Sequence, residues 1–249
     1  MAWILDLDGV VWRGEQPVAG AAAAVDRLRA RGERVLFVTN NSSATLPQYI
    51  DKLVRHGIDA SEDAVCTSAQ AAATLVPPGE RVLVCGGPGV AEALRARGAV
   101  VVKDGPADAV VVGWHRDFDF ARLTAAFDAV MGGGRLIGTN DDATYPTAEG
   151  LVPGGGAILA AVATATGVTP TIAGKPHEPM VSLVLDRLGA TPEGSVLVGD
   201  RPSTDGLMAR RLGVAFALVL SGVTAAGDLP VVPAPDVTAP DLATLVDRS

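Results

Sequence analysis

Two pairs of aspartates in this sequence are spaced to bind a divalent cation. Asp6 and Asp8 follow one short apolar run, and Asp200 and Asp205 follow another. Carboxylates this close repel one another, and a bound cation relieves the repulsion. Oxygen ligands from Asp6, Asp8 and Asp200 suit Mg²⁺, with water and a substrate phosphate completing an octahedron. We expect Asp205 to orient the metal site rather than to bind the ion directly.

Side chains that could hold a phosphate group follow two other apolar runs. Thr39 and Asn40 open a loop whose hydroxyl, amide and backbone N–H groups suit phosphate oxygens. Lys175 stands between a glycine and a proline and is one of three lysines among 20 basic residues. An ammonium at that position can hold an anion as a compact point charge. These residues predict a phosphate site close to the metal site.

The pattern of elements explains how residues so far apart in the sequence could meet. Apolar runs of strand length alternate with Ala-, Leu- and Arg-rich stretches of helical length, and glycines end several of the helices. This alternation predicts parallel strands joined by right-handed crossovers. Ligands bind beyond the carboxyl ends of the strands in such sheets. The two aspartate pairs, Thr39 and Lys175 each follow a predicted strand, so we expect all of them to lie in one site.

The predicted strands and helices fall into two α/β units. The predicted strands are residues 3–7, 34–38, 81–85, 99–103, 109–112, 135–139, 171–174, 195–198 and 214–220, and the predicted helices are residues 21–31, 45–56, 68–75, 90–97, 120–131, 157–166, 178–188 and 204–212. A Pro- and Gly-rich break at 76–79 starts the second unit. We expect a Rossmann-like doubly wound parallel-sheet core, residues 1–78 and 174–249, with an inserted smaller α/β cap domain, residues 79–173.

The four motifs together resemble those of the haloacid dehalogenase-like (HAD) phosphatases. The long insert between the second and third motifs is similar to that of subfamily IIA, the NagD-like and p-nitrophenyl phosphatase-like group. The resemblance covers nearly the whole chain. It is carried by the stretches Asp6-Leu7-Asp8-Gly9-Val10-Val11, Thr39-Asn40-Asn41, Gly174-Lys175-Pro176 and Gly199-Asp200 to Thr204-Asp205.

This resemblance implies a Mg²⁺-dependent phosphomonoesterase that acts on a small phosphorylated metabolite. Asp6 would be the nucleophile and would form an aspartyl-phosphate, while Asp8 would protonate the leaving group and then activate water. Splitting the hydrolysis into two transfers lets one acid–base residue serve both halves. The resemblance further implies that Mg²⁺ is held by the Asp6 side chain, the Asp8 carbonyl and Asp200, and the phosphoryl group by Thr39, Asn40 and Lys175, with Asp205 orienting them.

The insert resembles a C2-type cap, which closes over the site and contacts the leaving group. Residues 76–79 and 172–174 are the expected hinges. The candidate residues for contacting the leaving group are Trp114, His115, Arg116 and the loop 140–146. Proteins similar to this one often dimerise through the cap, so a homodimer is a further expectation.

Composition excludes several classes of function. The formal net charge is −8 and the sequence pI is about 4.8, which argues against nucleic-acid binding. Mean hydropathy is +0.31, but no apolar run approaches the roughly 18 residues that a membrane-spanning helix needs. Cys66 and Cys85 show no metal-binding spacing and are expected to be small buried residues. The first residues do not read as a secretory signal, so we expect a cytoplasmic protein without membrane contact.

Two alternative functions remain open at this point. A nucleotide-binding module is suggested by the glycine-rich turn 86–89 between a predicted strand and helix, but the G-x-G-x-x-G spacing fails because Glu92 stands at the third position counted from Gly87. We therefore interpret this turn as a tight connection within the cap. The presence of both Asp6 and Asp8 argues against a protein that binds without turnover. A phosphotransferase would use the same site with an acceptor other than water.

Overall fold

Two parallel β-sheets organise the chain in the computed structural model, which describes residues 1–147, 150–189 and 194–249. The strands of the larger sheet are β1 Ala2–Asp6, β4 Arg34–Thr39, β5 Val65–Thr67, β13 Val196–Gly199, β14 Ala215–Val219 and β15 Val237–Ala239. Their order across the sheet is β15-β14-β13-β1-β4-β5, and each neighbouring pair is parallel. The first and last thirds of the chain thus build one sheet.

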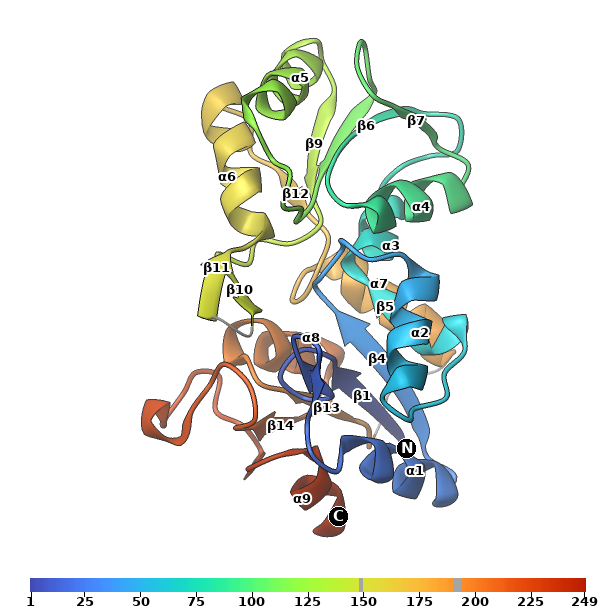
Figure 1. The fold of residues 1–249 in the computed structure, drawn as a ribbon, viewed down its shortest axis with the longest axis vertical. Helices are drawn as coiled ribbons and strands as arrows, with labels where there is room; N and C mark the ends of the chain where they lie inside the picture. Colours follow the sequence, from blue (N-terminus) through green and yellow to red (C-terminus); the bar gives the residue numbers. More distant parts are fainter. Residues whose placement is uncertain (148–149, 190–193) are drawn as a thin grey trace.

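The smaller sheet takes its five strands from the middle of the chain. They are β6 Arg81–Cys85, β7 Val100–Val102, β8 Ala109–Val112, β9 Arg135–Gly138 and β12 Thr171–Ile172. Their order is β12-β9-β8-β6-β7, again with parallel pairs. In Figure 1 this sheet and its helices lie above the larger sheet along the long axis of the molecule, and both chain ends lie in the lower part.

Helices cover both faces of the larger sheet. Successive strand residues point to opposite faces, so Trp3 and Leu5 pack on one side while Ile4 packs on the other. The first face is covered by α1 Ala21–Ala30, α2 Leu46–Arg55 and α9 Leu242–Asp247, and the second by α3 Ser68–Ala73, α7 Glu178–Leu188 and α8 Leu207–Leu212. The predicted doubly wound α/β fold is therefore confirmed.

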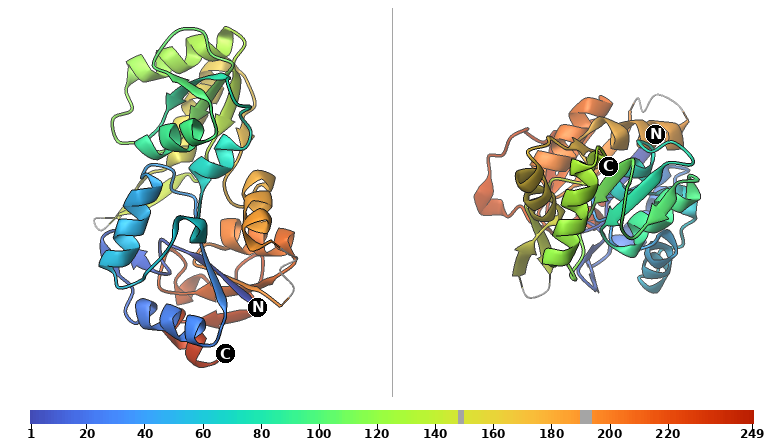
Figure 2. Two further views of the ribbon diagram at one scale, coloured as in Figure 1. Left: turned by 90° about the vertical axis from the view of Figure 1, so that its right-hand side faces the viewer. Right: turned by 90° about the horizontal axis from the view of Figure 1, so that it is seen from above.

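The smaller sheet is likewise packed between helices (Figure 2). Its coverings are α5 Phe120–Met131 and α6 Gly155–Thr166 on one face and α4 Pro88–Ala96 on the other. The remaining short elements are the hairpin strands β2 Trp12–Arg13 with β3 Gln16–Pro17 and β10 Thr144–Thr147 with β11 Gly150–Pro153, the 3₁₀ turns Glu62–Ala64 and Ala226–Asp228, and the π-turn Pro202–Gly206. The boundaries at 78/79 and 173/174 stay a prediction.

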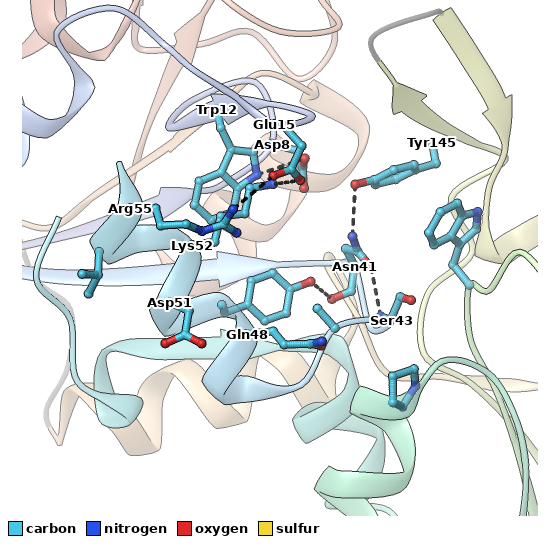
Figure 3. Close-up of a pocket in the computed structure, with 15 residues that line it drawn as sticks. Asp8, Trp12, Glu15, Asn41, Ser43, Gln48, Asp51, Lys52, Arg55 and Tyr145 are labelled. Atoms are coloured by element: carbon cyan, nitrogen blue, oxygen red, sulfur yellow. Dashed lines mark hydrogen bonds and ion pairs between the residues drawn. The ribbon is translucent and has the colours of Figure 1, made fainter. Parts of the chain in front are cut away.

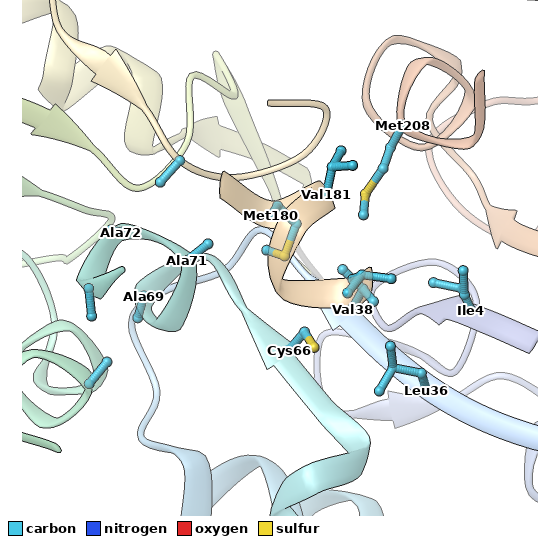
Figure 4. Packing of buried hydrophobic residues seen from close by; sticks show 14 of the residues in the cluster. Ile4, Leu36, Val38, Cys66, Ala69, Ala71, Ala72, Met180, Val181 and Met208 are labelled. Carbon is cyan, nitrogen blue, oxygen red and sulfur yellow. The ribbon is translucent and has the colours of Figure 1, made fainter. Parts of the chain in front are cut away.

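Helix α3 packs into an apolar cluster that the two sheets share, and Figure 4 shows the part of this cluster around α3, α7 and the larger sheet. Four of its alanines are buried in a cluster that contains Ile4 and Val38 of the larger sheet and Val111 and Ile137 of the smaller one. The short alanine side chains let α3 lie close to both α4 and α7. Burial of apolar area contributes roughly 25 cal/mol per Å², so this shared core holds the two sheets together.

The two cysteines and the helices of the described residues bear on two of the expectations from composition. Cys66 and Cys85 are free and buried, and burial raises the pKa of their thiols to about 12 and about 11. Both side chains therefore behave as the expected small apolar residues. No helix within the described residues is long and apolar enough to cross a membrane.

Candidate active site

The candidate residues gather at the carboxyl edge of the larger sheet. Asp6 and Thr39 are the last residues of β1 and β4, and Asp200 directly follows β13. Lys175 reaches the same edge from the other sheet, because it follows β12 after a short connection. Parallel strands bring these ends together although the residues are up to 194 positions apart in the sequence.

Lys175 is the buried cation of this cluster. Its Nζ lies 2.6 Å from Asp6 Oδ1 and 2.8 Å from Asp205 Oδ1, and its third contact is the carbonyl oxygen of Val38 at 3.3 Å. The residue is 2% exposed. Burial alone would favour the neutral amine, but the two carboxylates outweigh it and raise the pKa of Lys175 above its ordinary value. The ammonium is therefore held charged beside Asp6.

Three buried aspartates form an oxygen-rich group that fits a divalent cation. Asp6, Asp200 and Asp205 each place a carboxylate oxygen within 4.8 Å of the others. Burial raises the pKa of both Asp6 and Asp200, and repulsion from Asp205 adds to this, while Lys175 lowers it. A cation would offset this unfavourable concentration of negative charge, and an all-oxygen donor set suits Mg²⁺.

Asp200 is held in place by a loop that approaches very closely. Val223 N donates to Asp200 Oδ2 at 2.6 Å, and Ser221 Oγ donates to the carbonyl oxygen of Gly9 at 2.6 Å. A Cβ atom on Gly222 would lie 1.8 Å from Asp200 Oδ2, so only glycine fits there. Loop 221–223 thus fixes one oxygen of Asp200 and leaves the carboxylate facing Asp6.

Asp205 is already engaged by the protein through both of its oxygens. Oδ1 accepts from Lys175, and Oδ2 accepts from the backbone N–H of Arg201 at 3.1 Å. The π-turn Pro202–Gly206 positions this completely buried side chain. These bonds suit the orienting role expected for Asp205, although its carboxylate also lies in the acidic cluster.

The Asp8 carboxyl group is not one of the three clustered carboxylates and is bonded to the indole of Trp12. Its Oδ1 accepts from Trp12 Nε1 at 3.2 Å. Burial raises the pKa of Asp8, and the charge of Lys52 and the bond from Trp12 act against that shift. The side chain lines both the narrow hollow around Asp6 and the wide cleft outside it. A group in this position can exchange protons with a bound molecule on either side.

In the loop after β4, the Asn40 side chain, which was expected to face a phosphate, is bonded to protein groups instead. Its Nδ2 donates to Asp142 Oδ2 and to the Lys175 carbonyl oxygen, both at 3.0 Å, and its Oδ1 accepts from Lys175 N at 2.6 Å. The side-chain amide therefore ties together segments that are distant in the sequence. Thr39 is buried beside it, and its Oγ1 accepts from Asn41 N at 3.1 Å.

A wide cleft is lined by α2 and the hairpin of β2 and β3 on one side and by Pro88, Trp114 and Tyr145 on the other, and Figure 3 shows the residues that line it. It has a volume of about 770 Å³ and is joined through Asp8, Asn41 and Tyr145 to the hollow of about 50 Å³ that contains Asp6 and Lys175. Asn41 Nδ2 donates to Tyr145 Oη at 3.1 Å, which connects the two walls. Such a pair of spaces can accommodate a phosphate group and a larger organic group.

The cap residues expected to contact a leaving group divide into two sets. Trp114 and Tyr145 line the wide cleft, and their rings lie 4.6 Å apart. His115 is buried with its Nδ1 on the Gly113 carbonyl oxygen, and neither His115 nor Arg116 is among the residues that line the cleft. Within the loop 140–146, the residues that line the narrow hollow are Asp142, Thr144, Tyr145 and Pro146, whereas Asn140 donates to the Asn40 carbonyl oxygen.

The glycine-rich turn 86–89 contacts protein where a nucleotide would have to bind. Gly89 N, in the first turn of α4, donates to the Ser43 carbonyl oxygen at 2.9 Å. A Cβ atom on Gly87 would lie 2.6 Å from Ser43 Oγ, and one on Gly89 would lie 2.0 Å from the Ala44 carbonyl oxygen. These glycines let two backbones meet, so the turn has no room for a pyrophosphate.

Comparison with known proteins identifies the family. The model of haloacid dehalogenase-like hydrolases matches residues 3–100, and a second HAD-hydrolase-like model matches residues 172–245. An acid sugar phosphatase of Staphylococcus aureus is 36% identical over 231 residues, covering 92% of this chain and 89% of its own. The chain belongs to the haloacid dehalogenase-like hydrolase family, as its motifs indicated.

Solved structures agree with this assignment. A p-nitrophenyl phosphatase from Archaeoglobus fulgidus has a TM-score of 0.93 and 30% identity, covering 100% of this chain and 98% of its own. A glycerol phosphate phosphatase from Mycobacterium tuberculosis, in complex with magnesium, has a TM-score of 0.89 and 36% identity, covering 98% of this chain and 75% of its own. The p-nitrophenyl phosphatase neighbours confirm the resemblance to subfamily IIA.

Proposed function

We propose that this chain is a Mg²⁺-dependent phosphomonoesterase that hydrolyses a small phosphorylated metabolite through an aspartyl-phosphate on Asp6. The observation that carries the proposal is the buried contact of 2.6 Å between Lys175 Nζ and Asp6 Oδ1, next to two further carboxylates. An anionic carboxylate approaches a phosphate dianion only when positive charge offsets their repulsion. Lys175 supplies one such charge, and Mg²⁺ would supply the other and draw charge from the phosphate oxygens.

The residues of the chain divide the reaction into two transfers. An Asp6 carboxylate oxygen forms a bond to phosphorus while the bond from phosphorus to the leaving oxygen breaks, and Asp8 gives that oxygen a proton. Water then forms a bond to phosphorus, the Asp6–phosphorus bond breaks, and Asp8 takes a proton from the water. Asp8 returns to its starting state, which is why one acid–base residue serves both halves.

The remaining assignments follow the positions of the side chains. The Asp6 side chain, the Asp8 carbonyl oxygen and Asp200 would hold Mg²⁺, and Asp205 would orient Lys175 and the metal site. The phosphoryl group would be held by Thr39, Asn40 and Lys175. Because the Asn40 amide is engaged elsewhere, its contribution would come from the backbone N–H.

The wide cleft is where we place the leaving group. The charged residues among those that line it are Asp8, Glu15, Asp51, Lys52 and Arg55. This set carries no excess of positive charge, so the cleft favours an uncharged organic group over a second phosphate. The relatives are named for sugar phosphates, glycerol phosphate and p-nitrophenyl phosphate, in which the phosphate is carried by a sugar, a glycerol or an aryl group.

We further propose that residues 79–173 act as a C2-type cap. The carboxyl ends of β8 and β9 lead directly into Trp114, Asn140 and the loop that carries Tyr145, so this part of the chain forms the far wall of the cleft. A homodimer through this part of the chain is part of the proposal, and sedimentation of the purified protein tests whether two copies associate at all.

Phosphate release from p-nitrophenyl phosphate tests the proposed function. We expect activity that requires Mg²⁺ and is lost in chelator. Asp6→Asn keeps the shape of the side chain but removes the nucleophile, and should lower kcat by several orders of magnitude. Asp104→Asn, which changes an exposed aspartate outside the site, is the matched control and should be unchanged. Full activity of Asp6→Asn would overturn the assignment of the nucleophile.

A further inference from the structure

The indole of Trp12 is buried directly against the proposed acid–base residue. Its Nε1–H donates to Asp8 Oδ1 at 3.2 Å, and the residue is 1% exposed. The backbone adds to the fit, because Trp12 N donates to the Leu7 carbonyl oxygen at 3.1 Å and Gly9 N donates to the Trp12 carbonyl oxygen at 2.6 Å. Asp8 and Trp12 also form an isolated β-bridge. The donor and its acceptor are therefore parts of one tight loop.

A second contact of the Trp12 indole is with Lys52 of α2 (Figure 3). Its Nζ lies 4.4 Å from the centre of the Trp12 ring, a distance at which the ammonium is attracted by the aromatic face. The same Nζ donates to the Gly14 carbonyl oxygen at 2.6 Å and lies 3.2 Å from Glu15 Oε1. Lys52 thus fixes both the ring and the hairpin that carries it.

We propose that Trp12 is a positioning residue that fixes which oxygen of Asp8 exchanges the proton, an inference that rests on the proposed function. An indole N–H can only donate, so Trp12 can keep its bond to Oδ1 whether Asp8 is protonated or ionised. Oδ1 then acts as the carbonyl-type oxygen, and the proton belongs on Oδ2.

The position of that proton matters in both transfers. In the first, the Oδ2–H bond breaks as the proton moves to the leaving oxygen, and in the second Oδ2 takes a proton from water. Without the bond from Trp12, the carboxyl group could rotate and present its oxygens in either order. The proton would then often point away from the leaving oxygen, and general-acid catalysis would weaken.

Two aryl phosphates that differ in their need for a proton test this inference. Nitrophenolate leaves readily without protonation, whereas the more basic phenolate of phenyl phosphate needs it. The quantity to compare is kcat/KM, since it reports the steps up to the aspartyl-phosphate. Trp12→Phe keeps a buried ring but removes the N–H. Trp3→Phe is the matched control, because Trp3 is equally buried and its Nε1 has no hydrogen-bond partner among the described residues.

We expect Trp12→Phe to lower kcat/KM about tenfold more for phenyl phosphate than for p-nitrophenyl phosphate, since general acid–base catalysis contributes about 10²–10⁴ in rate. Trp3→Phe should change both substrates by the same factor. Equal slowing of both substrates in Trp12→Phe would overturn the positioning role and leave the proposed function intact. Failure of the wild-type protein to hydrolyse p-nitrophenyl phosphate at all would instead count against the proposed function.

A second measurement does not depend on the folding of Trp12→Phe. The chain has three tryptophans, so the indole N–H signals of ¹⁵N-labelled protein can be assigned with Trp3→Phe and Trp114→Phe. Asp8→Ala removes the acceptor and should shift the Trp12 signal and speed its exchange with solvent, while the Trp3 signal stays in place. A Trp12 signal that moves no more than that of Trp3 would overturn the inference.

Discussion

Replacing Lys175 by methionine is the most direct test of the charge balance in the site. Lys175→Met keeps most of the side-chain volume but leaves Asp6 and Asp205 buried without the ammonium that now lies 2.6 Å and 2.8 Å from them. Removing one partner of a buried ion pair typically costs about 3–5 kcal/mol. Because two carboxylates lose their partner here, we expect the free energy of unfolding to fall by about that amount in chelator.

Urea unfolding at pH 8 measures this change. Lys103→Met is the control, because Lys103 is exposed and its loss should change stability by less than about 0.5 kcal/mol. Mg²⁺ should restore part of the stability of Lys175→Met, since it brings positive charge back to the same carboxylates. Phosphatase activity should nevertheless stay reduced by about 10²-fold or more, because the phosphoryl group loses its ammonium. A variant as stable as wild type in chelator would refute the argument.

Two further predictions concern the contact between the sheets and the acidic cluster. Gly89→Ala places a Cβ atom 2.0 Å from the Ala44 carbonyl oxygen and should lower the free energy of unfolding by about 1–3 kcal/mol. Gly227→Ala is the control, because Gly227 has open space around it and the change should leave stability unaltered. Thermal unfolding of the two variants measures the difference. Burial raises the pKa of Asp200 to about 7, so the folded state holds a proton that the unfolded state loses near pH 4. The free energy of unfolding in chelator should therefore fall from about pH 4 to 7, with a shallower slope in Asp200→Asn; an equal slope in both proteins would contradict this.

Much of the fold could be predicted from the sequence because buried parallel strands leave a strong signal. The apolar runs 34–38, 81–85 and 109–112 are strands almost as predicted, and the glycine after residue 188 ends α7. The elements β5, β15 and α9 were not predicted, because they are short and their neighbours, rather than their own periodicity, stabilise them. Both short hairpins were missed for the same reason.

The gathering of the candidate residues at one edge of the sheet could be predicted from the sequence, but not all of their contacts could. Polar groups after strands are visible in sequence, so the proximity of Asp6, Lys175 and Asp200 could be foreseen. The proposed roles of Trp12 and Lys52 could not be foreseen. An aromatic residue usually belongs to the core, and a lysine on a helix usually belongs to the surface. The scarcity of lysine, used above for Lys175 alone, is a signal that could also have drawn attention to Lys52. The bonds of the Asn40 amide depend on the cap loop, whose position no local pattern fixes.

The alanine face of α3 has a consequence for engineering this enzyme. Helix α3 contacts α4 beside the smaller sheet and α7 and β5 of the larger one, and its buried alanines belong to an apolar cluster that both sheets share. Removing the insert would expose those alanines to water, so the shortened protein would have an exposed apolar surface prone to association as well as an open site. Grafting a foreign insert to change substrate preference would succeed only if the donor supplied a matching cover for α3.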